Sequence, residues 1–104
     1  MTNPYAGPVR KIVQFSLNPR SKPNAFVAAA KAGEAALRQM PGYRARTLCH
    51  SQGRWSDLVH WQDRDCAAAT AAALMSDPAF ADFMAMIDPA SVILSHHQVR
   101  WQKA

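Results

Sequence analysis

The apolar residues of this chain switch repeatedly between a period of two and steps of three and four, and the order of the switches limits the fold. A period of two is typical of strands with one buried face, and steps of three and four are typical of helices. The predicted elements, in chain order, are a strand over residues 9–17, a helix over 23–40, strands over 43–51 and 55–62, a helix over 66–75 that restarts over 79–87, and a strand over 91–101.

Turn and capping residues mark the boundaries of these segments. Ser21 followed by Pro23 is the combination of cap and first-turn proline that begins many helices. Gln52 and Gly53 separate two alternating segments and suit the tight turn of a hairpin. The chain therefore has the order strand, helix, strand, strand, helix, strand.

This order predicts an α+β, ferredoxin-like βαββαβ fold, in which a four-stranded antiparallel sheet carries both helices on one face. At 104 residues the chain has the size of one domain, so we expect a flexible leader over residues 1–8 and a single domain over residues 9–104. The other sheet face would keep large side chains such as Trp or Ile. A second copy is expected to cover it, which would make a homodimer and a dimeric α+β barrel.

Composition excludes several classes of protein. Twelve Lys and Arg against seven Asp and Glu give a formal net charge of +5, but the basic residues are spread over every element. Such a distribution is typical of a solvated surface, and it disfavours nucleic-acid binding. There is no membrane-length apolar run or secretory signal pattern, and the two cysteines have no metal or disulfide spacing. We expect a cytoplasmic protein that binds neither nucleic acid nor membrane.

Three short motifs, at the starts or ends of predicted elements, carry a resemblance to a known family. They are Pro41-Gly42-Tyr43 opening a strand, Trp61 just before a helix, and Ser76-Asp77-Pro78-Ala79-Phe80 restarting a helix. In these places the chain, over about residues 11–101, resembles the dimeric α+β barrel proteins of the antibiotic biosynthesis monooxygenase type. Some relatives are cofactor-independent oxygenases of polycyclic phenols, others degrade haem, and many have no assigned activity.

The resemblance also separates two branches of that group. The haem-degrading branch uses a histidine about one turn beyond the phenylalanine of the restarted helix, where this chain has Met84. The quinone-forming branch binds a phenol between sheet and helices with a tryptophan that Trp61 matches by position. The resemblance thus implies a monooxygenase-like activity on a small hydroxylated aromatic, with no metal, haem or flavin cofactor.

The predicted substrate pocket lies between the sheet and the helices. Its candidate substrate-binding residues are Trp61, Phe15, Phe80, Met84 and Trp55. An indole can line such a pocket and donate its N–H to a ligand oxygen, although large aromatic side chains in a small domain can equally be core.

Histidines supply the candidate proton acceptors. His97 and His60 are the candidate catalytic residues, since an imidazole can take a proton from a phenol. Each can equally be a hydrogen-bonded surface or interface histidine. The adjacent pair His96 and His97 points to opposite faces of its strand, so no metal site is expected.

Two charged positions leave alternatives open. Arg46, with Arg44 and His50, shares one side of the strand over 43–51, where these residues could hold an anionic substrate or protect an exposed sheet edge. Asp57, between apolar strand positions, could be an acid with a raised pKa or could pair with an arginine across the hairpin.

An alternative function is a non-catalytic small-molecule-binding or stress-associated barrel. The state of the protein interior distinguishes the two candidate functions. An open cavity with converging polar groups favours an enzyme, and a filled core favours the non-catalytic barrel. RNA-binding domains share the predicted topology, but the first strand offers Phe15 as its single aromatic residue, so it is a poor platform for base stacking.

Overall fold

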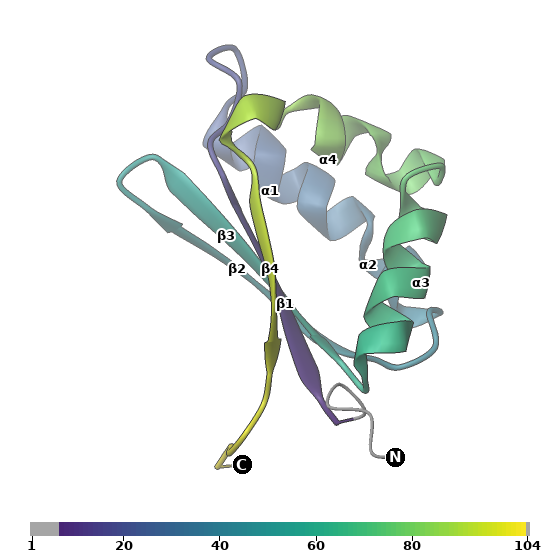
Figure 1. The fold of residues 1–104 in the computed structure, drawn as a ribbon. Coiled ribbons are helices and arrows are strands. Elements are labelled where there is room, and N and C mark those ends of the chain that lie inside the picture. Colours follow the sequence, from purple (N-terminus) through teal and green to yellow (C-terminus); the bar gives the residue numbers. More distant parts are fainter. Residues whose placement is uncertain (1–6, 104) are drawn as a thin grey trace.

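The computed structural model describes residues 7–103, which form a four-stranded antiparallel sheet with the helices packed on one face (Figure 1). The elements are β1 (Val9–Phe15), α1 (Pro23–Ala32), α2 (Glu34–Arg38), β2 (Tyr43–Ser51), β3 (Arg54–Trp61), α3 (Arg64–Leu74), the 3₁₀ turn η1 (Pro78–Phe80), α4 (Ala81–Ala85), the 3₁₀ turn η2 (Pro89–Ser91) and β4 (Ile93–Gln98). This confirms the α+β ferredoxin-like fold. Of the leader predicted over residues 1–8, only Gly7 and Pro8 fall among the described residues.

The strand order across the sheet is β2-β3-β1-β4. The central strands β1 and β3 come from the two different βαβ halves, as in other ferredoxin-like folds. The turn between β2 and β3 is built by Gln52 and Gly53, whose φ angles of 50° and 79° fit the left-handed backbone of a hairpin turn. A bulge between Tyr43 and Ala45 adds one residue to the start of β2.

The side of the sheet that faces the helices carries the aromatic core. Phe26 of α1 lies with its ring centroid 5.5 Å from Phe15, 4.9 Å from Trp55 and 4.9 Å from Phe83. Because side chains alternate along a strand, Trp55 and Trp61 both point to this side, and both are buried. The two strand tryptophans therefore belong to the interior.

The helix predicted over residues 23–40 is broken at Gly33 into α1 and α2, so its expected continuity was wrong. The ring of Phe80 occupies the place of a side chain here: a Cβ on Gly33 would lie 2.7 Å from its Cε1 and Cζ atoms. Glycine has a low helix propensity, so the helix is easily interrupted at this position. The missing side chain also allows the Phe80 ring of the 3₁₀ turn to pack closely against the backbone of Gly33.

Two further boundaries differ from the sequence predictions. Lys22, not Ser21, occupies the N-cap position of α1, and the Ser21 hydroxyl donates instead to the carbonyl of Met86 at 3.3 Å. The last strand is shorter than the predicted 91–101, since Ser91 belongs to η2 and the strand pairing ends at Gln98.

The open face of the sheet is less apolar than expected. The register places Ile12 beside Leu58 on this side, and Gln14 beside Ile93. No tryptophan of β1 to β4 lies there, so the large apolar groups expected on this face are limited to aliphatic side chains. Within residues 7–103, no helix has the length and apolar character needed to cross a bilayer.

Candidate functional site

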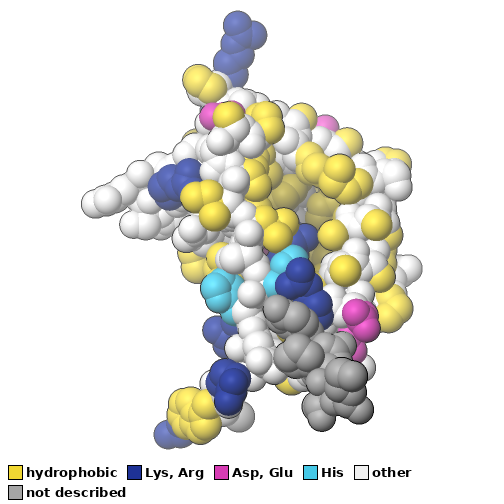
Figure 2. Space-filling view, in the orientation of Figure 1, with side chains coloured by type: hydrophobic (Ala, Val, Ile, Leu, Met, Phe, Trp, Pro, Cys, Tyr) yellow, Lys and Arg dark blue, Asp and Glu magenta, His cyan; other side chains and the backbone are white. Residues whose placement is uncertain are grey.

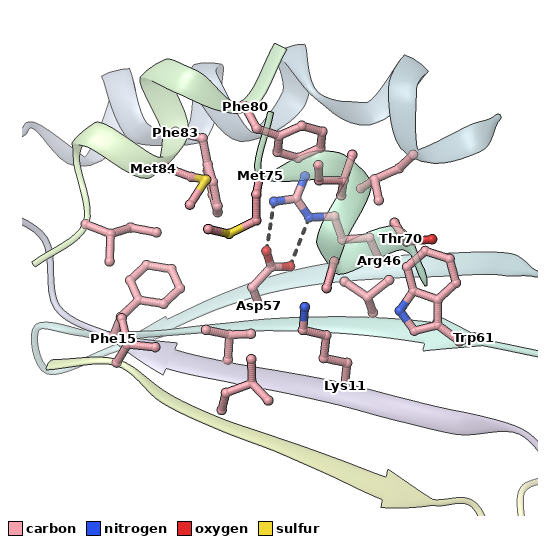
Figure 3. Close-up of a pocket in the computed structure, with 18 of the residues that line it drawn as sticks. Lys11, Phe15, Arg46, Asp57, Trp61, Thr70, Met75, Phe80, Phe83 and Met84 are labelled. Atoms are coloured by element: carbon pink, nitrogen blue, oxygen red, sulfur yellow. Dashed lines mark hydrogen bonds and ion pairs between the residues drawn. The ribbon is translucent and has the colours of Figure 1, made fainter. Parts of the chain in front are cut away.

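A cavity of about 380 Å³ lies between the sheet and the helices, in the layer where the sequence predicted a pocket (Figure 3). Strands β1, β3 and β4 supply its floor, and α3, η1 and α4 its roof. Most of its lining is apolar, and a few polar groups are confined to the strands and α3. The lining residues are Lys11, Val13, Phe15, Leu37, Arg46, Asp57, Val59, Trp61, Thr70, Ala71, Leu74, Met75, Phe80, Phe83, Met84, Ile87, Pro89, Val92 and Leu94.

The cavity opens between β4 and the helices. Figure 2 shows this opening as a hollow lined with hydrophobic side chains. Five of the lining residues are exposed, namely Met75, Met84, Pro89, Val92 and Leu94. The mouth is thus bounded by methionines on the helix side and by branched aliphatic residues on the β4 side.

Two nitrogen atoms meet the inner part of the cavity. Figure 3 shows the Lys11 ammonium rising from β1 toward this space, with the indole nitrogen of Trp61 facing the same region. The Trp61 Nε1 atom is buried and has no hydrogen-bond partner among residues 7–103. Burial lowers the pKa of Lys11, and the nearby Asp57 carboxylate only partly opposes this effect.

Arg46 and Asp57 form a buried ion pair on the cavity wall. Arg46 donates from Nε to Asp57 Oδ1 at 2.9 Å, from Nη2 to Oδ2 at 2.8 Å and from Nη1 to the carbonyl of Ala30 at 2.9 Å. Its guanidinium also lies 5.1 Å from the centroid of the Phe83 ring. This arrangement decides between the alternatives for Asp57, which pairs across the hairpin. Arg46 is buried in that pair, so it does not protect an exposed sheet edge as one of its two predicted roles required.

The bulge at the start of β2 separates Arg44 from Arg46. Arg44 is exposed, whereas the Arg46 side chain is 8% exposed. An extra residue reverses the side to which neighbouring side chains point, so the three-residue cluster predicted for one face of this strand does not form.

The structure brings four of the predicted substrate-binding residues to the cavity. Phe15, Trp61, Phe80 and Met84 all line it. Trp55 does not: its ring stacks on His50, with centroids 4.4 Å apart, and it lines a second groove of about 560 Å³ between α1, α2 and β2.

The predicted catalytic histidines lie elsewhere. His60 and His97 are both in register with Arg10, whose neighbours Val9 and Lys11 point to the helix side. Since side chains alternate, both histidines therefore lie on the open face of the sheet, and neither lines the cavity. His96 is in register with Lys11 and points to the helix side, and burial followed by the charges of Arg64 and Lys11 lowers its pKa.

Lys11 and Thr70 are polar cavity residues that sequence reasoning missed. The signal was present in β1, where Val9, Lys11, Val13 and Phe15 occupy alternate positions and share the buried side. A lysine at an inward position of a strand is unusual enough to indicate a site. Within the described residues, no cluster of three or more His, Cys, Asp or Glu side chains could hold a metal ion.

Comparison with known proteins supports the fold assignment. A scan of protein-family models and a search of curated proteins both gave no match to this sequence. Among solved structures, a mutant of SnoaB, a cofactor-independent oxygenase from Streptomyces nogalater, superposes with a TM-score of 0.75 at 17% identity, covering 93% of this chain and 97% of that one.

Two further solved structures are described as putative antibiotic biosynthesis monooxygenases. The Bordetella bronchiseptica protein has a TM-score of 0.75 at 15% identity and covers 91% of this chain and 99% of its own. The Nitrosomonas europaea protein has a TM-score of 0.68 at 19% identity and covers both chains completely, at 100%. The resemblance noted in the sequence is thus confirmed in three dimensions: this chain has the fold of the antibiotic biosynthesis monooxygenases.

Proposed function

We propose that this protein is a cofactor-independent oxygenase that oxidises a small hydroxylated aromatic molecule in the cavity between sheet and helices. The observation that carries the proposal is the buried Trp61 indole N–H, which faces an apolar cavity and has no acceptor within the described part of the chain. A buried donor without a partner costs about 1 to 3 kcal/mol, and a ligand oxygen would remove that cost. The structural likeness to SnoaB supports the same class of reaction.

The lining suits an aromatic ring that carries one polar group. Phe15, Phe80 and Phe83 offer ring faces and edges to a planar ligand. Trp61 would donate to the ligand oxygen and so fix which end of the molecule lies innermost. A volume of about 380 Å³ falls within the range of small-molecule sites.

Lys11 is the residue proposed to handle the proton. Its lowered pKa increases the share of the neutral amine, which can accept the phenolic proton and leave an electron-rich phenolate. Oxygen then adds at a ring carbon and the O–O bond breaks. For a phenol that becomes a quinone, the ring gains one oxygen atom and loses two hydrogens, which leave with the second oxygen as water. The substrate supplies all four electrons, so no separate reductant is required.

Incubation of the protein with hydroxyaromatic compounds under oxygen, followed by mass spectrometry, tests the proposal. We expect a product heavier by one oxygen and lighter by two hydrogens, with slower formation in Trp61→Phe and Lys11→Met. Trp55→Phe and Lys31→Met are matched controls outside this cavity, and His60→Ala and His97→Ala test the residues first predicted to be catalytic.

The outcomes separate the two functions considered. Equal turnover in the wild type, Trp61→Phe and Lys11→Met would contradict the proposed roles of these residues. Saturable binding of hydroxyaromatics to the wild type with no product under oxygen would instead favour the non-catalytic binding barrel. If His60→Ala or His97→Ala lost turnover while Trp61→Phe and Lys11→Met kept it, the catalytic residues would lie on the open face of the sheet.

We also propose that a second copy covers the open face of the sheet, as expected from the sequence, with β4 at the interface. β4 is an edge strand, and its Ile93 and Leu94 side chains are 58% and 51% exposed. Unpaired strand edges with aliphatic side chains favour association. Sedimentation velocity should show a dimer that Ile93→Arg weakens, and a monomer at all concentrations would contradict the pairing.

A further inference from the structure

We propose that the substrate of the proposed oxygenase carries a carboxylate, which His96 binds in its protonated form at the β4 edge of the cavity. This inference rests on the proposed function and adds a charged group to the expected substrate. His96 of β4 is directly opposite Lys11 of β1 and lies two positions beyond Leu94, and both of these neighbours line the cavity. All three side chains point to the helix side of the sheet, away from the face that the second copy is proposed to cover.

The hydrogen bonding of His96 indicates a missing partner. Its Nε2 atom is buried and has no hydrogen-bond partner among residues 7–103. An imidazole nitrogen that is removed from water without a partner is costly. The Nε1 atom of Trp61 is in the same state, and Trp61 lies on β3, on the other side of Lys11 from His96. A ligand with its hydroxyl group at Trp61 and a second polar group at His96 would satisfy both nitrogen atoms.

The charges around His96 favour an anion as that second group. Burial is the largest cause that lowers the pKa of His96, and the charges of three basic groups follow, namely Arg64, Lys11 and His97. Figure 2 shows a histidine side chain beside basic side chains at the lower end of the hollow. A neutral group would leave this positive charge uncompensated, whereas a carboxylate would offset it and would accept a charge-assisted hydrogen bond from the imidazolium.

The acidic side chains near this end of the cavity are engaged elsewhere or face solvent. Asp57 is the one acid among the described lining residues, and both of its carboxylate oxygens accept hydrogen bonds from Arg46. Asp63 caps α3 by accepting a hydrogen bond from a backbone amide at 2.8 Å, and Asp65 is exposed. None of these three carboxylates offsets the basic groups that act on His96. A ligand is therefore the natural source of the negative charge.

Protonation of His96 keeps a bound carboxylate compatible with Lys11 as the proton acceptor. A carboxylate alone would raise the pKa of Lys11 and reduce the neutral amine that the proposed reaction needs. A carboxylate paired with a protonated imidazole has no net charge, so the lowered pKa of Lys11 is largely retained. Free His96 is mostly neutral at pH 7, because its pKa is lowered from 6.5. Binding should therefore take up a proton at His96, and affinity should fall as the pH rises through the raised pKa of the complex.

Calorimetric titration of the full-length protein without oxygen, with 6-hydroxy-2-naphthoate and its neutral amide as the probes, tests the inference. The two ligands share the ring system and the hydroxyl group and differ in charge. At pH 6 we expect the carboxylate to bind at least tenfold more tightly than the amide, and at pH 8 this preference should be at least threefold smaller. NMR of the histidine ring protons in the wild type should show a raised His96 pKa with the carboxylate and an unchanged one with the amide.

His96→Gln should lose the preference for the carboxylate and bind the amide like the wild type. His97→Gln is the matched variant, because it removes the adjacent imidazole, which lies on the other face of the sheet, and it should keep the preference. Equal affinity of the wild type for both ligands at pH 6, or a preference that His96→Gln retains, would overturn the inference.

Turnover under oxygen separates this inference from the proposed function. Oxidation of both ligands with no preference for the carboxylate in binding would overturn the inference and leave the oxygenase proposal standing. Tight binding of the carboxylate that depends on His96, with no product under oxygen, would support the carboxylate site and contradict the oxygenase proposal.

Discussion

Arg46 and Asp57 meet side by side within the β2–β3 hairpin, with two parallel hydrogen bonds of 2.9 and 2.8 Å. They are not directly opposed: Asp57 faces Leu48, and Arg46 reaches it diagonally from two residues away. Both side chains are nearly buried, and Arg46 lines both the cavity between sheet and helices and the groove between α1, α2 and β2. The Arg46 side chain therefore separates the cavity from the groove, and Asp57 holds it in place from the cavity side.

Replacement of one partner should destabilise the protein strongly. Arg46→Met leaves the Asp57 carboxylate buried without its bidentate partner, and such losses cost about 3 to 5 kcal/mol. Urea denaturation measures the change in the free energy of unfolding. The exposed pair Arg38 and Glu34 is the matched control, since Arg38→Gln should cost less than about 0.5 kcal/mol. A loss in Arg46→Met no greater than in Arg38→Gln would show that the buried pair is energetically neutral.

Trp61→Phe should reduce affinity only for ligands that carry a hydroxyl group. The change keeps most of the ring and removes the indole N–H, so 2-naphthol should bind about tenfold more weakly, in line with one hydrogen bond of about 1.4 kcal/mol. Naphthalene, which accepts no such bond, should bind nearly as before. Calorimetry measures both, with Trp55→Phe as the control outside the cavity. Equal weakening for both ligands would indicate a packing role.

Gly33→Ala should lower stability even though alanine is the better helix former. The new methyl group would lie 2.7 Å from the Phe80 ring, so the ring must move into the cavity that it lines. Overpacking costs about 1 to 3 kcal/mol and the helix gain is about 1 kcal/mol, so the net loss should be up to about 2 kcal/mol. Thermal unfolding measures it. Phe80→Leu in the same chain should restore much of the loss, and failure to do so would place the strain elsewhere.

Acidification should destabilise the fold through two histidines. Burial is the largest cause that lowers the pKa of His60 and of His96 from 6.5. The unfolded state then binds more protons below pH 6.5, so the free energy of unfolding should fall as the pH decreases from that value. Urea denaturation at pH 8, 6.5 and 5 should show a smaller decrease in the free energy of unfolding in His60→Gln and His96→Gln than in the wild type. A wild-type free energy of unfolding that does not change with pH would contradict the lowered pKa of these two histidines.

Local chemistry was enough to predict the architecture. Alternation in β1 and β3, the Gln52-Gly53 turn and the proline caps each specify an element without reference to the rest of the chain. The break at Gly33 was not predictable in this way, because its cause is the Phe80 ring, which lies far away in the sequence. The shift of the helix cap from Ser21 also depends on a distant carbonyl, that of Met86.

The candidate site was only half predictable. Trp61 and Phe15 followed from the parity of their strands once one face was assigned to the helices. Successive side chains of a strand point to opposite faces of the sheet, so His60 and its neighbour Trp61 lie on opposite faces. A histidine at position 60 therefore could not line the cavity that Trp61 lines. The position of Arg46 depended on the bulge at Tyr43 and Ala45, for which alternation alone gives no signal.

The mouth of the cavity has two sides of different stiffness. Met75 and Met84 are unbranched and can rotate about three bonds, so their thioethers can move aside without any motion of the backbone. Val92, on the opposite side, is β-branched and confined about χ1. A ligand of the proposed kind would therefore be selected by its fit to the rigid β4 side, while the helix side would adjust to its thickness.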